Sequence, residues 1–203
     1  MEIDNPVVKP GFLEVYCGPV KSGKTGLLIK RVDKTNYMQN TKVLFLNPAI
    51  NTRDTTIKSR FGTKEYDFVS VNETKPYSIL KHVKKKHKII AIDEAQFFGR
   101  GIVEVVEALL QRKKNIIVAG LDLNFKAEPF GYMPNLLSIA NIVEKCSAVC
   151  DYGICNQAAT RSQLLIDNKP AHYNTCEIQI DDGSVVYEAR CLKHHIVPGK
   201  PKI

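Results

Sequence analysis

The sequence contains no apolar run as long as the roughly 18 residues that a membrane-spanning helix needs. Residues 1–9 carry two acids and a proline and have no apolar stretch, which excludes a signal peptide of the usual kind. Internal repeats and low-complexity segments are absent as well, so a repeat architecture is excluded. We therefore expect a cytoplasmic protein with no membrane partner.

Acidic residues are scarce relative to basic ones. The chain of 203 residues has 21 Asp and Glu against 29 Lys and Arg, which gives a formal net charge of +8. A basic chain suits nucleic acid, and it suits anionic small substrates such as nucleotides equally well. The run Lys84, Lys85, Lys86 resembles a nucleic-acid patch, but such runs are more often the solvated end of a helix. We expect the solvated helix end and no nucleic-acid partner.

The cysteines are distributed unevenly. Hydrophobic residues make up 44% of the chain, enough for a full core, and the length fits one domain with a small appendage. Four of the six cysteines lie after residue 149. In a reducing compartment cysteines are thiols or metal ligands rather than disulfides. Their distribution indicates two regions that are stabilised by different means.

Five short apolar runs predict buried strands, and they lie at residues 12–17, 43–46, 66–71, 88–92 and 115–120. Stretches with helical character lie between them, at residues 23–37, 77–86 and 102–112. Strands that alternate with helices imply parallel pairing, right-handed crossovers and helices covering the faces of the sheet. We therefore predict an α/β fold with an open parallel sheet in residues 11–147, after a short arm of residues 1–10.

The pattern changes after Cys150. Short alternating stretches at residues 162–166, 176–180 and 184–190 predict strands, and Asp182–Gly183 is a hairpin-turn signal. A lobe of about 50 residues is too small to be stable through its own core alone. We expect a small β-rich lobe at residues 148–195, stapled by a metal ion and followed by a tail at residues 196–203.

A phosphate-binding loop follows the first predicted strand. The pattern G-x-x-x-x-G-K-[ST] is matched by Gly18, Pro19, Val20, Lys21, Ser22, Gly23, Lys24 and Thr25. The two glycines let the backbone curl so that its N–H groups point at phosphate oxygens, and the helix N-terminus adds partial positive charge. Lys24 can reach the β- and γ-phosphates of ATP, and the Thr25 hydroxyl can ligate Mg²⁺.

Two acids end the fourth predicted strand. Asp93 and Glu94 follow the apolar run at residues 89–92, and such acids lie beside the phosphate loop in open α/β sheets. We expect Asp93 to hold Mg²⁺ through water, which leaves Glu94 to accept a proton from an attacking hydroxyl. These two motifs do not distinguish a kinase from an ATPase, because the same glutamate can activate water.

Four side chains at the two ends of the lobe form a candidate zinc site. Structural Zn²⁺ prefers four tetrahedral N and S ligands, and the candidates are Cys150, Cys155, Cys191 and His194. Such a site would supply folding free energy directly. Several alternatives remain open: Cys146 in place of one member of the first pair, His195 or His172 in place of His194, or Cys176. The place of Cys176 in an alternating strand favours a small buried apolar role instead.

At this point the sequence resembles the thymidine kinase family of the cytosolic cellular type, which carries a zinc-binding lasso domain. The resemblance runs from about residue 11 to residue 195. It rests on six segments and on the position of Tyr187 four residues before Cys191; the segments are GPVKSGKT at 18–25, NPAINTR at 47–53, IDEAQFF at 92–98, LDLNF at 121–125, PFG at 129–131 and AVC at 148–150. The first segment is shared by many ATPases, and the combination is much narrower.

The resemblance implies a P-loop NTPase (RecA-like) fold with a C-terminal zinc-binding lasso domain. It implies an ATP-dependent kinase that phosphorylates the 5′-hydroxyl of thymidine, and of deoxyuridine, to give dTMP and ADP in nucleotide salvage. Glu94 matches the general base. Lys24 and Thr25 match the phosphate and magnesium contacts, and Arg53 matches an arginine near the transferred phosphate.

The nucleoside pocket is also implied by the resemblance. Its apolar walls match Phe97, Leu121, Phe125 and Phe130. Tyr187 matches a tyrosine of the lasso that lies near the sugar. Ser162 and the backbone from Ile178 to Gly183 match the positions at which the lasso hydrogen-bonds the pyrimidine edge. A flat base favours apolar walls, and its polar edge favours fixed donors and acceptors. Plain core packing is an alternative for the aromatic residues, and we expect at least one of Phe97 and Phe98 to face inward.

The family also assembles as homotetramers and binds dTTP as a feedback inhibitor, and both are expected here from the resemblance alone.

Three positions depart from the family pattern. Asn51 replaces a common Asp, Val20 replaces a common Met near the thymidine methyl group, and the C-x₄-C spacing of Cys150 and Cys155 is longer than the usual C-x₂-C.

Two other classes of function compete with the kinase. One is a nucleic-acid-stimulated ATPase with a zinc-ribbon module, which the basic charge and the paired cysteines favour. Against it, the chain has little room for helicase motifs and few aromatic platforms in the lobe. The other is a zinc-stabilised scaffold without activity, and the intact set of Lys24, Thr25, Asp93 and Glu94 argues against it.

Overall fold

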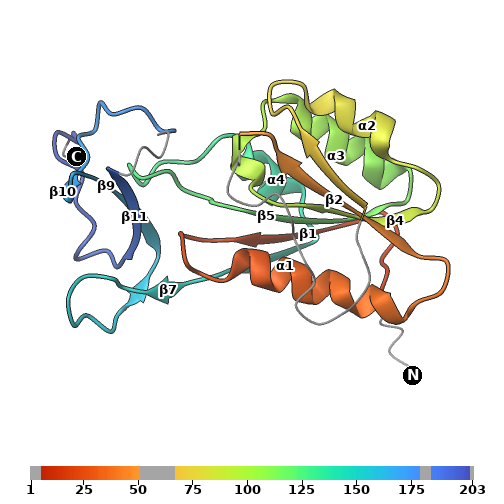
Figure 1. Ribbon diagram of the computed structural model, residues 1–203, viewed down its shortest axis with the longest axis horizontal. Coiled ribbons are helices and arrows are strands. Elements are labelled where there is room, and N and C mark those ends of the chain that lie inside the picture. Colours follow the sequence, from red (N-terminus) through yellow and green to blue (C-terminus); the bar gives the residue numbers. More distant parts are fainter. Residues whose placement is uncertain (1–5, 51–66, 179–183, 202–203) are drawn as a thin grey trace.

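Six parallel strands form the main sheet of the protein, and a smaller β-rich lobe lies beyond one end of it (Figure 1). The computed structural model describes residues 6–50, 67–178 and 184–201. No helix within these ranges is long and apolar enough to cross a membrane. The N-terminal end of the described chain lies at the end of the molecule opposite the lobe.

The strand order of the main sheet is β3-β2-β4-β5-β1-β6. The strands are β1 Phe12–Cys17, β2 Lys42–Pro48, β3 Asp67–Val71, β4 His87–Ile92, β5 Asn115–Gly120 and β6 Ile142–Lys145. All pair in parallel, so the predicted α/β fold with an open parallel sheet is confirmed. Strand β6 was not predicted, because it is a short edge strand whose four side chains are exposed and give no buried apolar run.

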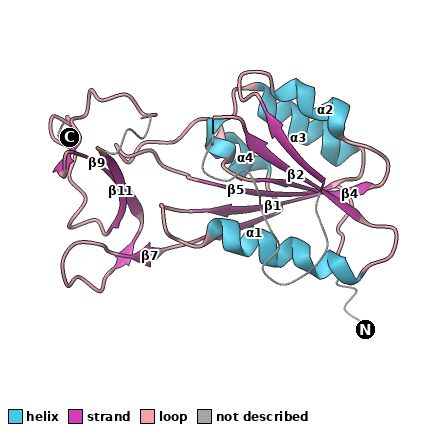
Figure 2. Ribbon diagram, in the orientation of Figure 1, coloured by secondary structure: helices cyan, strands magenta, loops and turns pink. Residues whose placement is uncertain are grey.

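Helices cover both faces of the sheet (Figure 2). Helix α1, Lys24–Asp33, packs Leu28 and Val32 against one face, and α3, Gly101–Gln111, packs against the other. Helix α4, Met133–Ile139, shares the core cluster of α3. Each Å² of apolar surface that these helices bury contributes roughly 25 cal/mol to the free energy of folding, and this burial holds the helices on the sheet.

The predicted helix boundaries were wrong at two places. The first helix ends at Asp33, and residues Lys34–Tyr37 form a separate 3-10 turn, η1. The second helix is only α2, Ile79–His82, after the 3-10 turn η2 at Pro76–Ser78. It ends because Val83 is extended, so the run Lys84–Lys86 lies exposed in the turn before β4 rather than on a helix end. Helix α4 was not predicted.

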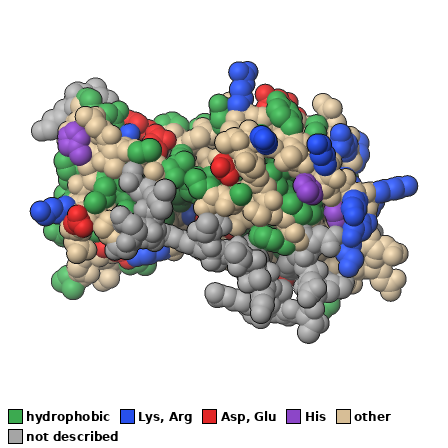
Figure 3. All heavy atoms as spheres, turned by 45° about the horizontal axis from the view of Figure 1, so that its top comes forward, with side chains coloured by type: hydrophobic (Ala, Val, Ile, Leu, Met, Phe, Trp, Pro, Cys, Tyr) green, Lys and Arg blue, Asp and Glu red, His purple; other side chains and the backbone are tan. Residues whose placement is uncertain are grey.

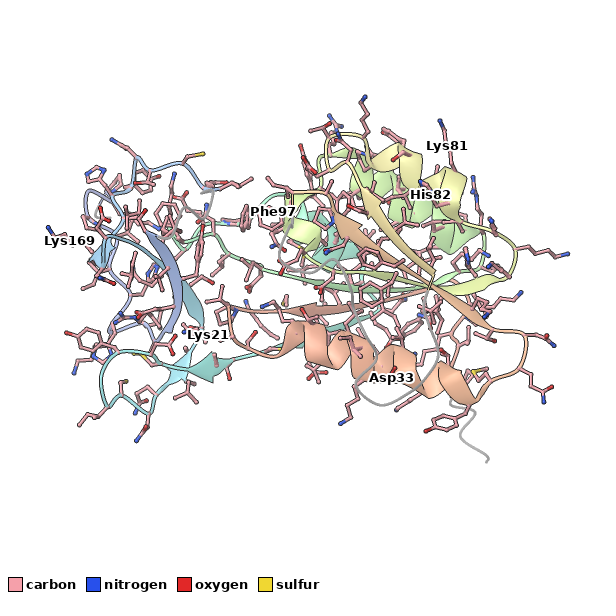
Figure 4. All side chains as sticks on the ribbon, in the orientation of Figure 1. Lys21, Asp33, Lys81, His82, Phe97 and Lys169 are labelled. Atoms are coloured by element: carbon pink, nitrogen blue, oxygen red, sulfur yellow. The ribbon has the colours of Figure 1, made fainter. Side chains whose placement is uncertain are left out.

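Basic side chains gather at the end of the molecule opposite the lobe (Figure 3). Lys81 and His82 of α2 lie at this end, as Figure 4 shows. The third 3-10 turn, η3 at Ala95–Phe97, follows β4 at the opposite edge of the sheet.

The lobe contains two small antiparallel sheets. Its three-stranded sheet has the order β10-β9-β11, with β9 Arg161–Ile166, β10 Lys169–Pro170 and β11 Val185–Arg190. A two-stranded sheet pairs β7, Ala148–Val149, with β8, Ala158–Ala159.

One predicted lobe strand is wrong in its described part. Residues 176–178 form no strand, and Cys176 is exposed rather than buried. Strand β9 pairs instead with β11 and with β10. Asp167 and Asn168 make the turn between β9 and β10 at positive φ (49° and 61°), a conformation that Asp and Asn tolerate. The predicted turn at Asp182–Gly183 lies outside the described residues.

A buried ion pair ties α1 to the sheet. Arg31 donates from Nε and Nη2 to the two carboxylate oxygens of Glu14 on β1, at 2.8 and 2.7 Å. Asn115 on β5 donates to the same carboxylate at 3.3 Å. The side chains of Arg31 and Glu14 are only 12% and 6% exposed. The helix that begins at the phosphate loop is therefore fixed to the neighbouring strands β1 and β5.

We predict that Glu14→Ala lowers the free energy of unfolding by about 3 kcal/mol, because it leaves the Arg31 guanidinium buried without its carboxylate. Chemical denaturation measures this change. The control is Glu107→Ala, which removes an exposed acid of α3 and should change stability by no more than about 0.5 kcal/mol. Equal stabilities of the two variants would show that the ion pair contributes little.

Candidate active site

The carboxyl ends of β1, β4 and β5 meet at the edge of the sheet that faces the lobe (Figure 1). The phosphate loop follows β1, Asp93 and Glu94 follow β4, and the segment from Leu121 follows β5. Crevices at this edge are where open α/β sheets bind their ligands. The fold therefore brings three separate motifs of the sequence to one place.

The phosphate loop has the backbone that a phosphate cradle needs. Gly23, just before α1, has φ of 81°, and Gly18 has φ of 138° with no room for a Cβ, which would lie 2.3 Å from the Cys146 carbonyl oxygen. Lys24 Nζ donates to the Pro19 carbonyl at 2.6 Å and to Ser22 Oγ at 3.3 Å. Burial lowers the pKa of Lys24, and the charges of Glu94 and Asp93 oppose that shift. The ammonium group thus lies over the loop, beside both acids.

Asp93 is a buried carboxyl group, 5% exposed. Burial and the nearby charge of Glu94 raise the pKa of Asp93 to about 7, although hydrogen bonds from the Thr25 side chain and the Glu94 backbone N–H act in the opposite direction. A carboxyl group that is held beside a hydroxyl and is short of compensating positive charge suits a hard cation such as Mg²⁺, which prefers oxygen ligands.

Glu94 is held by a side chain that the sequence analysis missed. Gln96 donates from Nε2 to the Glu94 carboxylate at 2.6 Å, and its Oε1 accepts the Leu121 backbone N–H at 3.0 Å. Glu94 itself has a left-handed backbone, with φ of 49°. Gln96 is 2% exposed. A polar residue inside the apolar run after Glu94 was the available signal.

Gln96 is itself closely confined. A Cβ on Gly131, where φ is 52°, would lie 2.3 Å from the Gln96 carbonyl oxygen, and one on Gly120 would lie 2.8 Å from Gln96 Oε1. The segment around Gly131 therefore packs directly on the turn that carries Gln96. This confinement fixes the amide, and through it the Glu94 carboxylate.

A further acid at this edge was not predicted. Asp122 is 6% exposed, and its Oδ2 pairs with Lys145 Nζ of β6 at 3.0 Å. Its backbone carbonyl accepts the Phe130 N–H at 3.0 Å. The pair joins the segment after β5 to the edge strand across the intervening β1.

The aromatic residues divide between the site and the core. Phe97 is half-buried and packs edge-on against Phe130, with ring centroids 5.8 Å apart. Phe98 is 1% exposed and belongs to the sheet core, so one of the two neighbours faces inward as expected. Phe125 lies in the core of the lobe, together with Leu164, Ala171 and Val185, and Tyr187 packs against that cluster.

The other predicted nucleoside residues are placed as follows. Ser162 is 2% exposed, and its hydroxyl accepts the Val20 N–H of the phosphate loop at 3.1 Å. Leu121 lies beside Gln96, to which it donates its N–H, and Ile178 is 40% exposed. Arg53 and Asn51 lie outside the described residues, as do residues 179–183.

Four side chains of the lobe come together as a candidate metal centre. One ligand atom from each of Cys150, Cys155, Cys191 and His194 lies within 4.8 Å of all the others. His194 Nδ1 lies 3.6 Å from Cys150 Sγ and 3.5 Å from Cys191 Sγ. This N and S donor set fits tetrahedral Zn²⁺.

The Cys150 thiol is suited to ligation. Burial raises the pKa of Cys150, but hydrogen bonds from the backbone of Cys191 and Tyr152 and from His194 outweigh it, and the pKa falls to about 6. The backbone N–H of Cys191 donates to Cys150 Sγ at 3.3 Å. A thiolate is the form that binds a metal.

The alternative ligands are used elsewhere or lie apart from the group. Cys146 follows β6, where its N–H donates to the Cys17 carbonyl at 2.7 Å. His195 Nε2 donates to the Phe125 carbonyl at 2.8 Å, and His172 accepts from the Asn174 N–H. None of these three residues, nor Cys176, joins the described group.

Comparisons with known proteins agree with this geometry. Residues 11–195 match the thymidine kinase family. The thymidine kinase of Coprothermobacter proteolyticus is 41% identical, over 96% of this chain and 95% of its own. The chain belongs to the thymidine kinase family. Members of this family are ATP-dependent kinases that phosphorylate thymidine, and this chain is one of them.

Two further relatives cover nearly as much of the chain. The thymidine kinase of Mycoplasma genitalium is 44% identical over 92% of this chain and 84% of its own. That of Mycoplasmoides gallisepticum is 41% identical over 94% of this chain and 84% of its own. Among solved structures, the flagellar accessory protein FlaH from Methanocaldococcus jannaschii has a TM-score of 0.49 at 12% identity, covering 77% of each chain.

We predict that Gln96→Ala lowers kcat by about 10- to 100-fold with a much smaller change in KM for ATP, because it frees the Glu94 carboxylate to leave its position. Steady-state kinetics with thymidine and Mg·ATP measure both constants. The control is Gln111→Ala, an exposed glutamine at the end of α3, which should behave as the unaltered protein. An unchanged kcat in the Gln96 variant would mean that Glu94 needs no such support.

Proposed function

We propose that this thymidine kinase transfers the γ-phosphate of ATP to the 5′-hydroxyl of thymidine, and of deoxyuridine, to give dTMP and ADP in nucleotide salvage. The observation that carries the proposal is the Glu94 carboxylate, held by Gln96 beside Lys24 and Asp93 at the edge of the sheet. A carboxylate in that place can take a proton from a hydroxyl that attacks the γ-phosphorus.

Glu94 acts as the general base. Its carboxylate accepts the proton of the 5′-hydroxyl, the oxygen forms a bond to the γ-phosphorus, and the bond from that phosphorus to the β,γ-bridging oxygen breaks to release ADP. Lys24 and the backbone N–H groups of residues 18–25 bind the phosphates and stabilise the charge that develops on them. Arg53 is proposed to lie near the transferred phosphate.

Magnesium is the proposed cation of this site. Thr25 and Asp93 would hold it, because they place a hydroxyl and a buried carboxyl group together, and oxygen donors are what Mg²⁺ prefers. When bound, it neutralises negative charge on the β- and γ-phosphates. Lys24 and Thr25, which follow one another at the start of α1, thus serve the phosphates and the cation from one turn of helix.

The nucleoside is proposed to bind between the sheet edge and the lobe. Phe97 and Phe130, which pack edge to face, would form apolar walls for the base together with Leu121 and Phe125. Tyr187 would lie near the sugar, and Ser162 and the backbone from Ile178 onward near the polar edge of the base. The Val20 N–H donates a hydrogen bond to the buried Ser162 hydroxyl. This contact supports a role for Ser162 in positioning the lobe over the phosphate loop.

The metal centre is proposed to be structural zinc. Cys150, Cys155, Cys191 and His194 supply all four ligands and leave no position for a substrate. The cluster around it is small, with Ala159 and Ala189 as its other buried members. A core of that size suits a lobe that depends on metal for its stability.

Other properties are proposed from family membership. They are a homotetrameric state and feedback inhibition by dTTP. The sequence pattern further supports a cytoplasmic location and the division into an arm (1–10), an ATP-binding domain (11–147), a lasso domain (148–195) and a tail (196–203). Part of the tail packs on the lobe, since Gln163 hydrogen-bonds both the N–H and the carbonyl of Ile196.

The first test is ADP release from Mg·ATP with thymidine, deoxycytidine, single-stranded DNA or nothing added. We expect release that depends on thymidine, with a matching monophosphate product, and loss of turnover in Glu94→Gln with ATP binding retained. Release driven by DNA with thymidine inert would favour the nucleic-acid-stimulated ATPase. Wild-type turnover in Glu94→Gln would remove the glutamate from its proposed role.

A second prediction concerns the metal. We expect one zinc per chain, and we expect Cys191→Ser to lose the zinc and to weaken thymidine binding much more than ATP binding, because the lobe supplies one side of the proposed nucleoside site and none of the proposed phosphate ligands. Metal analysis and binding measurements on the full chain test this. Cys176→Ser and Cys146→Ser are matched controls that should keep the metal, since neither cysteine belongs to the group. Retention of zinc by the Cys191 variant would contradict the assignment.

A further inference from the structure

The lobe touches the phosphate loop directly. Val20 packs against the buried cluster around Cys150 and Cys191, and its N–H donates to Ser162. The next residue, Lys21, forms an ion pair with Asp151 of the lobe, with Nζ 2.8 Å from Oδ2. The contacts of Val20 belong to the metal centre and to the proposed nucleoside site, but the ion pair joins two charged side chains that the mechanism does not use.

Asp151 is held in place by the lobe itself. The oxygen that accepts Lys21 also accepts the Ala189 N–H at 2.7 Å, and the Asp151 N–H donates to the Ala189 carbonyl at 2.8 Å. Ala189 lies on β11 between Tyr187 and the metal-centre residue Cys191. The carboxylate is therefore anchored to the strand that carries a proposed nucleoside contact, next to Cys150 in the chain.

Lys21 is the other end of this connection. It lies three residues before Lys24 in the phosphate loop and has φ of 60°, a left-handed backbone that a residue with a side chain rarely adopts. Its side chain lies between the start of α1 and the lobe (Figure 4). The side chain of Lys21 is 53% exposed and that of Asp151 is 29% exposed. The ion pair is therefore accessible to salt.

We infer that Lys21 and Asp151 are positioning residues that couple the lobe to the phosphate loop. Their ion pair holds the left-handed turn of the loop in the conformation that receives ATP, so an ordered lobe raises the affinity for ATP. Because such coupling is reciprocal, bound ATP also favours the ordered lobe. The inference rests on the proposed function, in that it assigns the loop to ATP.

The size of the effect follows from the exposure of the pair. Exposed ion pairs contribute up to about 1 kcal/mol, which corresponds to an affinity change of up to about fivefold. Ionic strength of about 1 M screens such a pair almost completely. The coupling should therefore be modest at low salt and small at high salt.

A double-mutant cycle on the full chain tests the inference. The variants are K21M, D151N and K21M/D151N; the asparagine keeps an acceptor for the Ala189 N–H and removes only the charge. The readout is the Kd of a non-hydrolysable Mg·ATP analogue, measured without nucleoside, and zinc content is determined for each variant. Lys30→Ala, an exposed lysine of α1, is the control for loss of one positive charge.

We expect each single variant to bind the analogue about two- to fivefold more weakly, and the double variant to be no weaker than either single one. K21R should regain most of the affinity lost in K21M, and high salt should narrow all the differences. Lys30→Ala should match the unaltered protein. If D151N loses zinc, its comparison with K21M/D151N decides the matter: a Lys21 that acts only through Asp151 makes no further difference there, whereas a Lys21 that contacts the nucleotide directly makes the double variant weaker.

Three results would overturn the inference. A weaker K21M beside an unaltered D151N would mean that Lys21 contacts the nucleotide directly. Additive losses, or no loss in either single variant, would mean that the pair couples nothing. If the unaltered protein fails to bind the analogue at all, the proposed function fails instead, so the two failures are distinguishable.

Discussion

The common direction of the six strands is the constraint on which the site depends. Because every strand of the sheet is parallel, β1, β4 and β5 end at the same edge, and the residues after them meet there. Lys24, Asp93 and Glu94 come from segments far apart in the chain, yet burial and mutual charge already alter the pKa values of Lys24 and Asp93. The ion pair of Arg31 and Glu14 fixes α1, and with it the phosphate loop, to that edge.

Hydrogen bonds and close packing at this edge hold the Glu94 carboxylate in one position. Glu94 occupies a strained left-handed backbone, and its side chain is bound by Gln96, whose amide is in turn bound by Leu121. Gly120 lies against the side-chain amide of Gln96, and Gly131 lies against its backbone carbonyl, so that a Cβ at either glycine would collide with Gln96. Backbone strain persists only where the surroundings over-determine it, and these contacts satisfy that condition for Glu94, the proposed general base.

Local patterns predicted the buried strands, the phosphate loop and the four candidate zinc ligands. Each of these features depends on residues in one or two short segments, where the physical requirement restricts which residue types can occur. Strand β6 escaped because its side chains are exposed, and α4 because it is short and starts with a proline near its N-terminus. The role of Gln96 was not predicted because it depends on a hydrogen bond to the backbone N–H of Leu121, which lies 25 positions further along the chain. The strand predicted at residues 176–180 followed alternation alone, whereas pairing of β9 with β10 and β11 decided the sheet.

The lobe presents the harder case, since its role depends on contacts that no local pattern contains. Lys21 and Asp151 are separated by 130 positions and meet only because the lobe lies over the phosphate loop. Ser162 was predicted to contact the polar edge of the base, and its hydroxyl accepts a hydrogen bond from the Val20 N–H of that same loop. Both contacts join the lobe to the phosphate loop, and so join the proposed nucleoside site to the proposed ATP site. A kinase that must bring two substrates into line benefits from that connection, because a displacement of about 1 Å between them lowers the rate by about 100-fold.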